Sequence, residues 1–173
     1  MKSYKEILKD INTLIFDVDG VLTDSSILLL PPNEMIRTMN TRDGYALQKA
    51  VKAGLNVCII TGGNSMSVKN RLEYLGIPDI YMASKNKIAD FEDYLAKKGV
   101  TKEQVMYMGD DIPDYEVMQL VGLPTCPHDA AEEIKAISRY VSPKDGGKGA
   151  VRDITEQILK IHGLWMIDKT QAI

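Results

Sequence analysis

The sequence predicts an α/β protein in which one parallel β-sheet carries helices on both of its faces. Three observations support this fold class. Short apolar runs without polar alternation, typical of strands buried on both faces, recur along the chain. Amphipathic stretches of about ten to fifteen residues separate these runs, as in βαβ units. Glycine follows several of the helical stretches, where helices commonly end. Right-handed crossovers join such units, so the strands run parallel.

Each element follows from this alternation of patterns. The predicted strands are the apolar runs at 13–18, 55–60, 79–83, 104–109, 123–126 and, at one edge, 139–142. The predicted helices lie between and after them, at 43–53, 64–75, 87–98, 113–121, 130–137 and 149–162. Ligands of such sheets bind outside the carboxyl ends of the strands. The residues that follow each strand are therefore the first candidates for a site.

One segment departs from the alternation. Residues 24–40 contain two β-like runs around a Pro-Pro-Asn-Glu turn, which predicts a small β-hairpin inserted after the first strand. The run 27–30 is too apolar to face water comfortably, and a lone hairpin is marginally stable. We therefore expect the hairpin to pack on another subunit. The whole chain, 1–173, is expected to form a single domain with a C-terminal tail at about 163–173.

The composition argues against several classes of partner. The chain has 173 residues and a formal net charge of −3, so it has no overall positive charge for nucleic acid or an anionic membrane. No apolar run approaches membrane-spanning length, and the charged N-terminus has no signal-peptide pattern. Cys58 and Cys126 suggest neither a disulfide framework nor a zinc site. We expect a cytoplasmic protein.

Polar residues follow four of the predicted strands, and the carboxyl ends of parallel strands meet at one edge of a sheet. They are Asp17 and Asp19, then Thr61, then Lys85 and Lys87, and finally Asp110, Asp111 and Asp114. So many carboxylates repel one another unless a cation lies between them. Oxygen ligands without a nearby His or Cys favour Mg²⁺ over zinc, and Mg²⁺ usually binds beside a substrate phosphate.

The same edge of the sheet suits a phosphate ester. Thr61 and the backbone N–H groups of Gly62 and Gly63 can hold phosphate oxygens at a helix N-terminus, and a lysine adds a compact positive charge. Asp17 and Asp19 are two residues apart, so they share one face of an extended strand. Asp17 suits a nucleophile that attacks phosphorus, and Asp19 suits a general acid that later acts as a base.

Four motifs resemble those of the haloacid dehalogenase superfamily of phosphatases, over nearly the whole chain. They are DVDGVLTD (17–24), the Thr-Gly at 61–62, the lysine after the third strand, and GDDIPD (109–114). NTRDGYAL (40–47) and GGKGAVRD (146–153) narrow the resemblance to the 3-deoxy-D-manno-octulosonate 8-phosphate (KDO-8-phosphate) phosphatases. That family lacks a large cap domain, and this chain agrees because only a short segment separates the first motif from NTRDGYAL.

The resemblance implies a Rossmann-like haloacid dehalogenase fold without a cap domain. It implies Mg²⁺-dependent hydrolysis of a sugar-acid phosphate, most specifically KDO-8-phosphate in lipopolysaccharide precursor synthesis, through an aspartyl-phosphate intermediate. The implied metal ligands are Asp17, the backbone carbonyl of Asp19, and Asp110, supported by Asp111 and Asp114. The implied contacts to phosphate are Thr61, Gly62 and Lys87, and Arg42 is expected to meet the sugar acid. A homotetramer is also implied, with each site closed by a neighbouring subunit and its C-terminal tail.

Two alternatives stay open. A nonulosonate (sialic-acid-like) 9-phosphate phosphatase would use the same machinery, since specificity depends on a few residues at the rim of the site. The family often has a basic residue after the Thr-Gly pair, where this sequence has Gly63. A non-catalytic sugar-phosphate binding module is the other alternative. It predicts loss of Asp17 or Asp19, and both residues are present.

Overall fold

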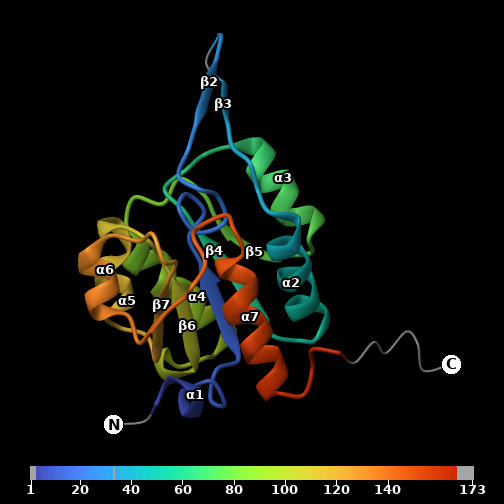
Figure 1. The fold of residues 1–173 in the computed structure, drawn as a ribbon, viewed down its shortest axis with the longest axis vertical. Helices are drawn as coiled ribbons and strands as arrows, with labels where there is room; N and C mark the ends of the chain where they lie inside the picture. Colours follow the sequence, from blue (N-terminus) through green and yellow to red (C-terminus); the bar gives the residue numbers. More distant parts are fainter. Residues whose placement is uncertain (1–2, 33, 167–173) are drawn as a thin grey trace, which may run out of the picture.

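A six-stranded parallel sheet forms the centre of the protein, in the order β5-β4-β1-β6-β7-β8 (Figure 1). The structure is a computed structural model that describes residues 3–32 and 34–166. The strands are β1 (Thr13–Phe16), β4 (Asn56–Ile60), β5 (Asp79–Tyr81), β6 (Val105–Met108), β7 (Leu123–Cys126) and β8 (Tyr140–Val141). The predicted parallel α/β architecture, including its edge strand, is confirmed.

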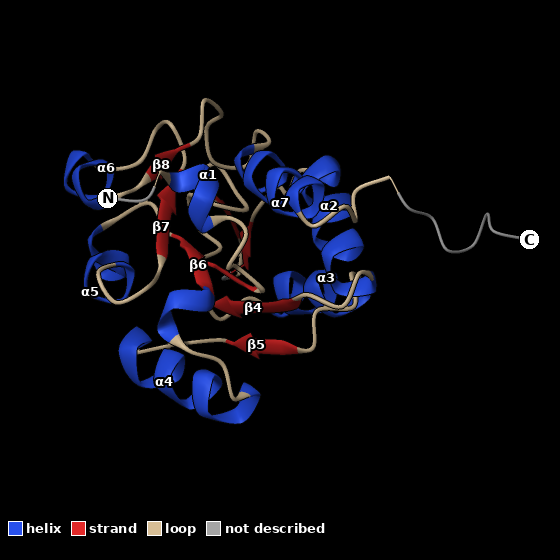
Figure 2. Ribbon diagram, turned by 90° about the horizontal axis from the view of Figure 1, so that it is seen from below, coloured by secondary structure: helices blue, strands red, loops and turns tan. Residues whose placement is uncertain are grey.

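Helices cover both faces of this sheet (Figure 2). One face packs against α2 (Thr41–Lys52), α3 (Met66–Tyr74) and α7 (Ala150–Ile161), with the short α1 (Tyr4–Ile7) at its border. The other face packs against α4 (Lys87–Lys98), α5 (Tyr115–Met118) and α6 (Glu132–Ile137). Two single turns of 3₁₀-helix, η1 (Lys102–Gln104) and η2 (Ile112–Asp114), flank β6. The chain thus forms three layers with the sheet in the middle.

The central strand β1 is buried on both sides, as its continuous apolar sequence predicts. Leu14 and Phe16 pack into the cluster on the α2, α3 and α7 side. Ile15 packs into the cluster on the α4, α5 and α6 side. Successive side chains of a strand point to opposite faces, so a strand with helices on both faces has no position that faces solvent. Asp17, which ends the run, is the first residue that can face a cavity.

Some element boundaries differ from the sequence prediction. The helix expected at 113–121 is instead η2 followed by the four-residue α5. Asp111 caps η2, because its side chain accepts a hydrogen bond from the Ile112 N–H, and Pro113 lies within that first turn. The helix α2 begins two residues earlier than expected, because the Asn40 side chain caps it by accepting from the Arg42 N–H at 2.8 Å.

The predicted hairpin consists of β2 (Leu28–Leu30) and β3 (Glu34–Ile36), paired antiparallel. It projects away from the three layers at one end of the molecule (Figure 1). Its apolar side chains are exposed, with Leu28 at 60%, Leu29 at 69% and Met35 at 55%. Among the described residues, no helix is both long and apolar enough to cross a membrane.

Candidate active site

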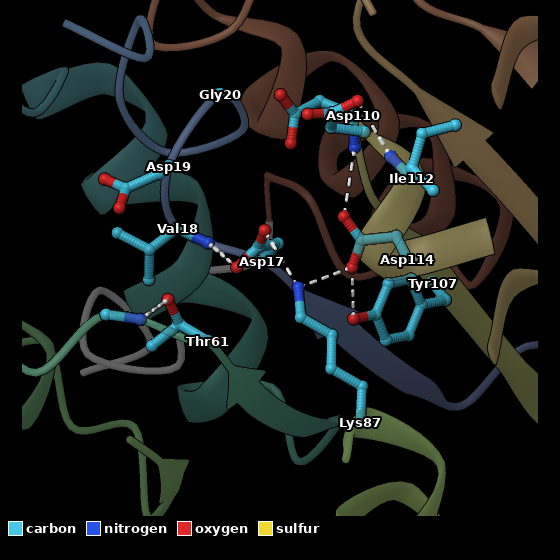
Figure 3. Close-up of polar contacts among 12 residues, drawn as sticks. Asp17, Val18, Asp19, Gly20, Thr61, Lys87, Tyr107, Asp110, Ile112 and Asp114 are labelled. Atoms are coloured by element: carbon cyan, nitrogen blue, oxygen red, sulfur yellow. Dashed lines mark hydrogen bonds and ion pairs between the residues drawn. The ribbon is translucent and has the colours of Figure 1, made fainter. Parts of the chain in front are cut away.

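A buried ion-pair network lies at the carboxyl ends of β1 and β6 (Figure 3). The Lys87 ammonium, at the start of α4, lies 2.9 Å from Asp17 Oδ2 and 2.7 Å from Asp114 Oδ1. The Tyr107 hydroxyl donates a second hydrogen bond to Asp114 Oδ1, at 2.7 Å. Burial alone would lower the pKa of Lys87, but the two carboxylates raise it. The lysine is therefore held charged between two acids.

Three carboxylates gather closely enough to share a cation. Asp17, Asp110 and Asp114 each offer an oxygen within 4.8 Å of the others. Burial and repulsion from Asp114 raise the pKa of Asp17 to about 6. Burial, followed by repulsion from Asp17 and Asp114, raises the pKa of Asp110 to about 8. The single charge of Lys87 does not offset the burial and mutual repulsion of these carboxyl groups, and a divalent cation would supply further positive charge.

The hydrogen bonds indicate which of these acids face the ion. Asp114 Oδ1 accepts from Lys87 and Tyr107, and its Oδ2 accepts from the Asp110 N–H at 3.3 Å. Both oxygens of Asp114 are thus engaged, and its side chain is fully buried. Asp17 is also engaged, by the Val18 N–H at 2.7 Å and by Lys87 at 2.9 Å, but Asp17 and Asp110 keep some exposed surface whereas Asp114 has none, so these two are the acids that a cation could reach directly. This donor set, made of oxygen alone, fits Mg²⁺.

Glycine allows Asp110 to approach the first motif. Gly20 has φ +84°, and a Cβ built there would collide with the Asp110 carboxylate. The loop that contains Gly146 and Gly147 packs behind the same turn. A Cβ at Gly146 would collide with the Gly20 carbonyl, and the Gly147 N–H donates to the Val21 carbonyl at 2.9 Å. The GGKG sequence therefore supports the turn that follows Asp17, backbone against backbone.

A cavity of about 650 Å³ opens beside this network. Asp17, Asp19, Lys85 and Lys87 contribute charged groups to it, and residues 61–63 form part of its wall. Thr61 follows β4 and is 2% exposed, and its Oγ1 accepts from the Gly63 N–H at 3.1 Å. The strand-end residues thus meet at one cavity. Of the two candidate lysines, Lys87 is buried against Asp17, whereas Lys85 is exposed.

Asp19 lies on the other side of Asp17 from Asp110 and Asp114 (Figure 3). Its carboxylate pairs with Arg37, from Nε to Oδ1 at 2.6 Å and from Nη2 to Oδ2 at 3.0 Å. Arg37 was not predicted as a site residue, because it follows the hairpin strands and no motif of the sequence includes it. Only the path of the hairpin brings it back to Asp19.

Other predicted residues lie outside the cavity within one chain. Arg42 is exposed and lines a second cavity with Lys144, Lys148, Arg152 and Lys160. Asp111 is exposed and caps η2. Trp165 packs on its own chain, with the Arg152 guanidinium 4.8 Å from its ring. The rest of the tail, 167–173, lies outside the described residues, so the expectation that it covers a neighbour's site stays a prediction.

Comparison with known proteins identifies the family to which this chain belongs. Residues 74–153 match the family model described as haloacid dehalogenase-like hydrolase. The KDO-8-phosphate phosphatase of Escherichia coli K12 is 38% identical over 165 residues, which is 95% of this chain and 88% of that protein.

Solved structures agree with the sequence comparison. The KDO-8-phosphate phosphatase of Yersinia pestis superposes with a TM-score of 0.90 at 34% identity, covering 93% of this chain and 87% of that one. The same phosphatase from Moraxella catarrhalis, in complex with a magnesium ion, a phosphate ion and KDO, has a TM-score of 0.89 at 31% identity, covering 93% and 92%. This chain therefore belongs to the haloacid dehalogenase-like hydrolases, in the family of the KDO-8-phosphate phosphatases.

Proposed function

We propose that the protein is a Mg²⁺-dependent phosphatase that hydrolyses KDO-8-phosphate to KDO and phosphate, a step in lipopolysaccharide precursor synthesis in the cytoplasm. The buried Asp17–Lys87–Asp114 network beside the Asp110 carboxylate is the observation that carries this proposal. The similar Moraxella catarrhalis structure, which holds a magnesium ion, a phosphate ion and KDO, supports the substrate and the metal.

In the proposed reaction, Asp17 Oδ attacks phosphorus and forms an aspartyl-phosphate while the bond to the sugar oxygen breaks. Asp19 gives its proton to that departing oxygen. Asp19 then takes a proton from water, which attacks the aspartyl-phosphate and releases inorganic phosphate and the free Asp17 carboxylate. Each step balances without a further reactant.

The surrounding groups hold the phosphate and the charges. Thr61, the Gly62 N–H and Lys87 bind phosphate oxygens at the wall of the cavity. The proposed Mg²⁺ ligands are Asp17, Asp110 and the Asp19 backbone carbonyl. When bound, the ion offsets the negative charge that develops on the transferring phosphoryl group. Asp114 fixes Lys87, and Asp111 orders the turn after Asp110.

The proposed assembly is a homotetramer of single-domain chains, 1–173. The exposed leucines of the hairpin support it, because a contiguous apolar surface usually marks a protein contact. Arg42 lies outside the cavity of its own chain, so its proposed contact with the sugar acid requires it to reach the site of a neighbouring copy. The C-terminal tail is proposed to close that site as well.

A phosphate-release assay with Mg²⁺ tests the function. We expect the wild-type protein to release phosphate from KDO-8-phosphate faster than from a nonulosonate 9-phosphate, and slowest from glucose 6-phosphate. The Asp17→Asn variant is the control: without the nucleophile, kcat should fall by about 10⁴-fold or more. Faster release from the 9-phosphate would identify the alternative substrate. No release from any of the three esters would reject the phosphatase.

A further inference from the structure

Arg37 makes the one ion pair to the Asp19 carboxylate among the contacts of the described residues. The planar guanidinium meets both carboxylate oxygens, at 2.6 Å to Oδ1 and 3.0 Å to Oδ2. The Arg37 side chain is only 8% exposed, although Asp19 is 35% exposed. A two-point contact with a rigid fork fixes the direction of a carboxylate as well as its charge.

Arg37 lies where its side chain can link the hairpin to Asp19. It follows β3 directly, at the point where the hairpin returns to the body of the protein. The side chains before it on β3 are exposed, whereas its own side chain turns inward to β1. Arg37 Nη1 also donates to the Met35 carbonyl at 3.3 Å. The guanidinium is therefore attached to the hairpin at one end and to Asp19 at the other.

The contact also orients the two oxygens of Asp19. Arg37 Nε holds Oδ1 at 2.6 Å, and Nη2 holds Oδ2 at 3.0 Å. A Cβ built at Gly63 would lie 3.5 Å from Asp19 Oδ2 and 3.9 Å from Arg37 Nη2. Oδ2 is thus the oxygen on the side of Gly63, which lines the cavity. Without the arginine, a half-exposed aspartate would rotate among several rotamers.

We propose that Arg37 is a positioning residue of the phosphatase reaction: it holds the whole Asp19 carboxylate, through the hairpin, in the orientation that places Oδ2 on the cavity side, toward the oxygen that leaves phosphorus. The inference rests on the proposed function and names a residue that the four motifs do not contain. Because Arg37 acts through Asp19, its loss should lower kcat more than it changes KM.

The test is a double-mutant cycle with p-nitrophenyl phosphate and KDO-8-phosphate as probes, both with Mg²⁺. Arg37→Met removes the fork and keeps a flexible, unbranched side chain in place of the arginine stem. We expect it to lower kcat on KDO-8-phosphate by about ten- to a hundredfold, the usual loss for a misdirected catalytic group, with KM changed by less than about threefold. Arg37→Lys, which keeps the charge, should recover part of kcat. Arg139→Met, an exposed arginine before β8, is the matched control and should match the wild type.

The Asp19→Asn background separates positioning from folding. If Arg37 acts through Asp19, Arg37→Met should lower the residual kcat of Asp19→Asn by less than about twofold, because coupled residues are not additive. A full further loss in that background, or a loss shared by Arg139→Met, would overturn the inference. If the wild-type protein hydrolyses only p-nitrophenyl phosphate, the proposed sugar substrate is wrong. The double-mutant cycle can then still be measured with p-nitrophenyl phosphate and still tests the role of Arg37. A wild-type protein inactive on both esters would reject the function and the role of Arg37 together.

Discussion

Lys87 is the residue that joins two buried acids of the site. Its ammonium pairs with both Asp17 and Asp114, and all three side chains are largely buried. A buried pair contributes little in comparison with an apolar replacement of both partners, but removal of one partner leaves an uncompensated charge. The position of Lys87 at the start of α4 thus matters for stability as well as for the proposed phosphate binding.

Substitution of Lys87 by Met is expected to lower the free energy of unfolding at pH 7 by about 3–5 kcal/mol, because Asp17 and Asp114 lose their shared cation. Chemical denaturation measures this change. Lys85→Met is the matched control, since Lys85 is two residues away and exposed. Its effect should stay within about 0.5 kcal/mol. Equal losses in the two variants would contradict the stabilising role of the buried network.

The raised pKa values make metal binding depend on pH. Asp110 has a pKa of about 8 and Asp17 a pKa of about 6 in the metal-free protein. Because Mg²⁺ must displace these protons, its apparent affinity should fall by about tenfold per pH unit below pH 8 and by about a hundredfold per unit below pH 6. Calorimetric titration with Mg²⁺ measures this slope. A pH-independent affinity between pH 5.5 and 8 would contradict it.

The free energy of unfolding of the metal-free protein should fall as the pH rises, whereas the affinity for Mg²⁺ rises. The folded protein binds protons at these two carboxyls more tightly than the unfolded chain, whose carboxyls have pKa values near the ordinary 3.8. The contribution of these two carboxyls to the free energy of unfolding is fully present below pH 4. It is lost as the pH rises through about 6 for Asp17 and about 8 for Asp110.

The rule that ligands bind at strand ends predicted which residues would meet, since Asp17, Asp19, Thr61 and Lys87 line one cavity. It could not predict Arg37, because the rule applies to the sheet, whereas this side chain arrives from an inserted hairpin. The capping role of Asp111 was also beyond the sequence. In GDDIPD, only the backbone geometry determines that Asp111 caps a turn while Asp110 faces the proposed metal site.

Among the elements, the hairpin projects from the three layers and leaves its apolar side chains exposed, so the proposed contacts between copies are assigned to it. Its apolar pattern was visible in the sequence, as were the strands that β1, β4 and β6 form. The helix predicted at 113–121 is longer than the observed α5. The sequence near Pro113 fits a helix equally well whether its first turn is an α-helical or a 3₁₀ turn, so the pattern could not show where α5 begins. Element boundaries depend on caps, which are single hydrogen bonds.

Substitution of Leu30 by Lys is expected to weaken self-association. Leu30 is 38% exposed and lies opposite Glu34 in the hairpin. A lysine at position 30 would form a favourable cross-strand pair with Glu34, so the hairpin itself should be retained. Loss of one buried leucine per contact should raise the dissociation constant by about tenfold or more. Light scattering at several concentrations measures the mass. Ile161→Lys, at 40% exposure on the far end of α7, is the control and should leave the mass unchanged. A wild-type monomer would contradict the proposed assembly.

At the scale of the whole molecule, the fold class was predictable because β-strand and helix patterns alternate from one end of the chain to the other. The order of the strands in the sheet was not derivable from those patterns. β1 hydrogen-bonds to β4 on one side and to β6 on the other, so partners distant in sequence flank the strand that precedes Asp17.

Metal removal is expected to affect the protein as a whole. EDTA should abolish phosphate release, and excess Mg²⁺ should restore it. Saturating Mg²⁺, at about a hundred times its dissociation constant, should add about 2.7 kcal/mol of stability and raise Tm by several degrees at pH 8. Scanning calorimetry measures the shift. Asp110→Asn should remove most of this rise, and an unchanged rise in that variant would exclude Asp110 as a ligand.

The close packing of Gly146 against Gly20 has a consequence for how the protein is made. The turn that contains Gly20 leaves the ribosome more than a hundred residues before Gly146, whose backbone supports it. A nascent chain that ends before residue 146 lacks this backing, so it can carry every predicted phosphate ligand and still be inactive. Catalytic competence should therefore arise only after residues 146 and 147 have been translated, and no translation product that ends before them should hydrolyse the sugar phosphate.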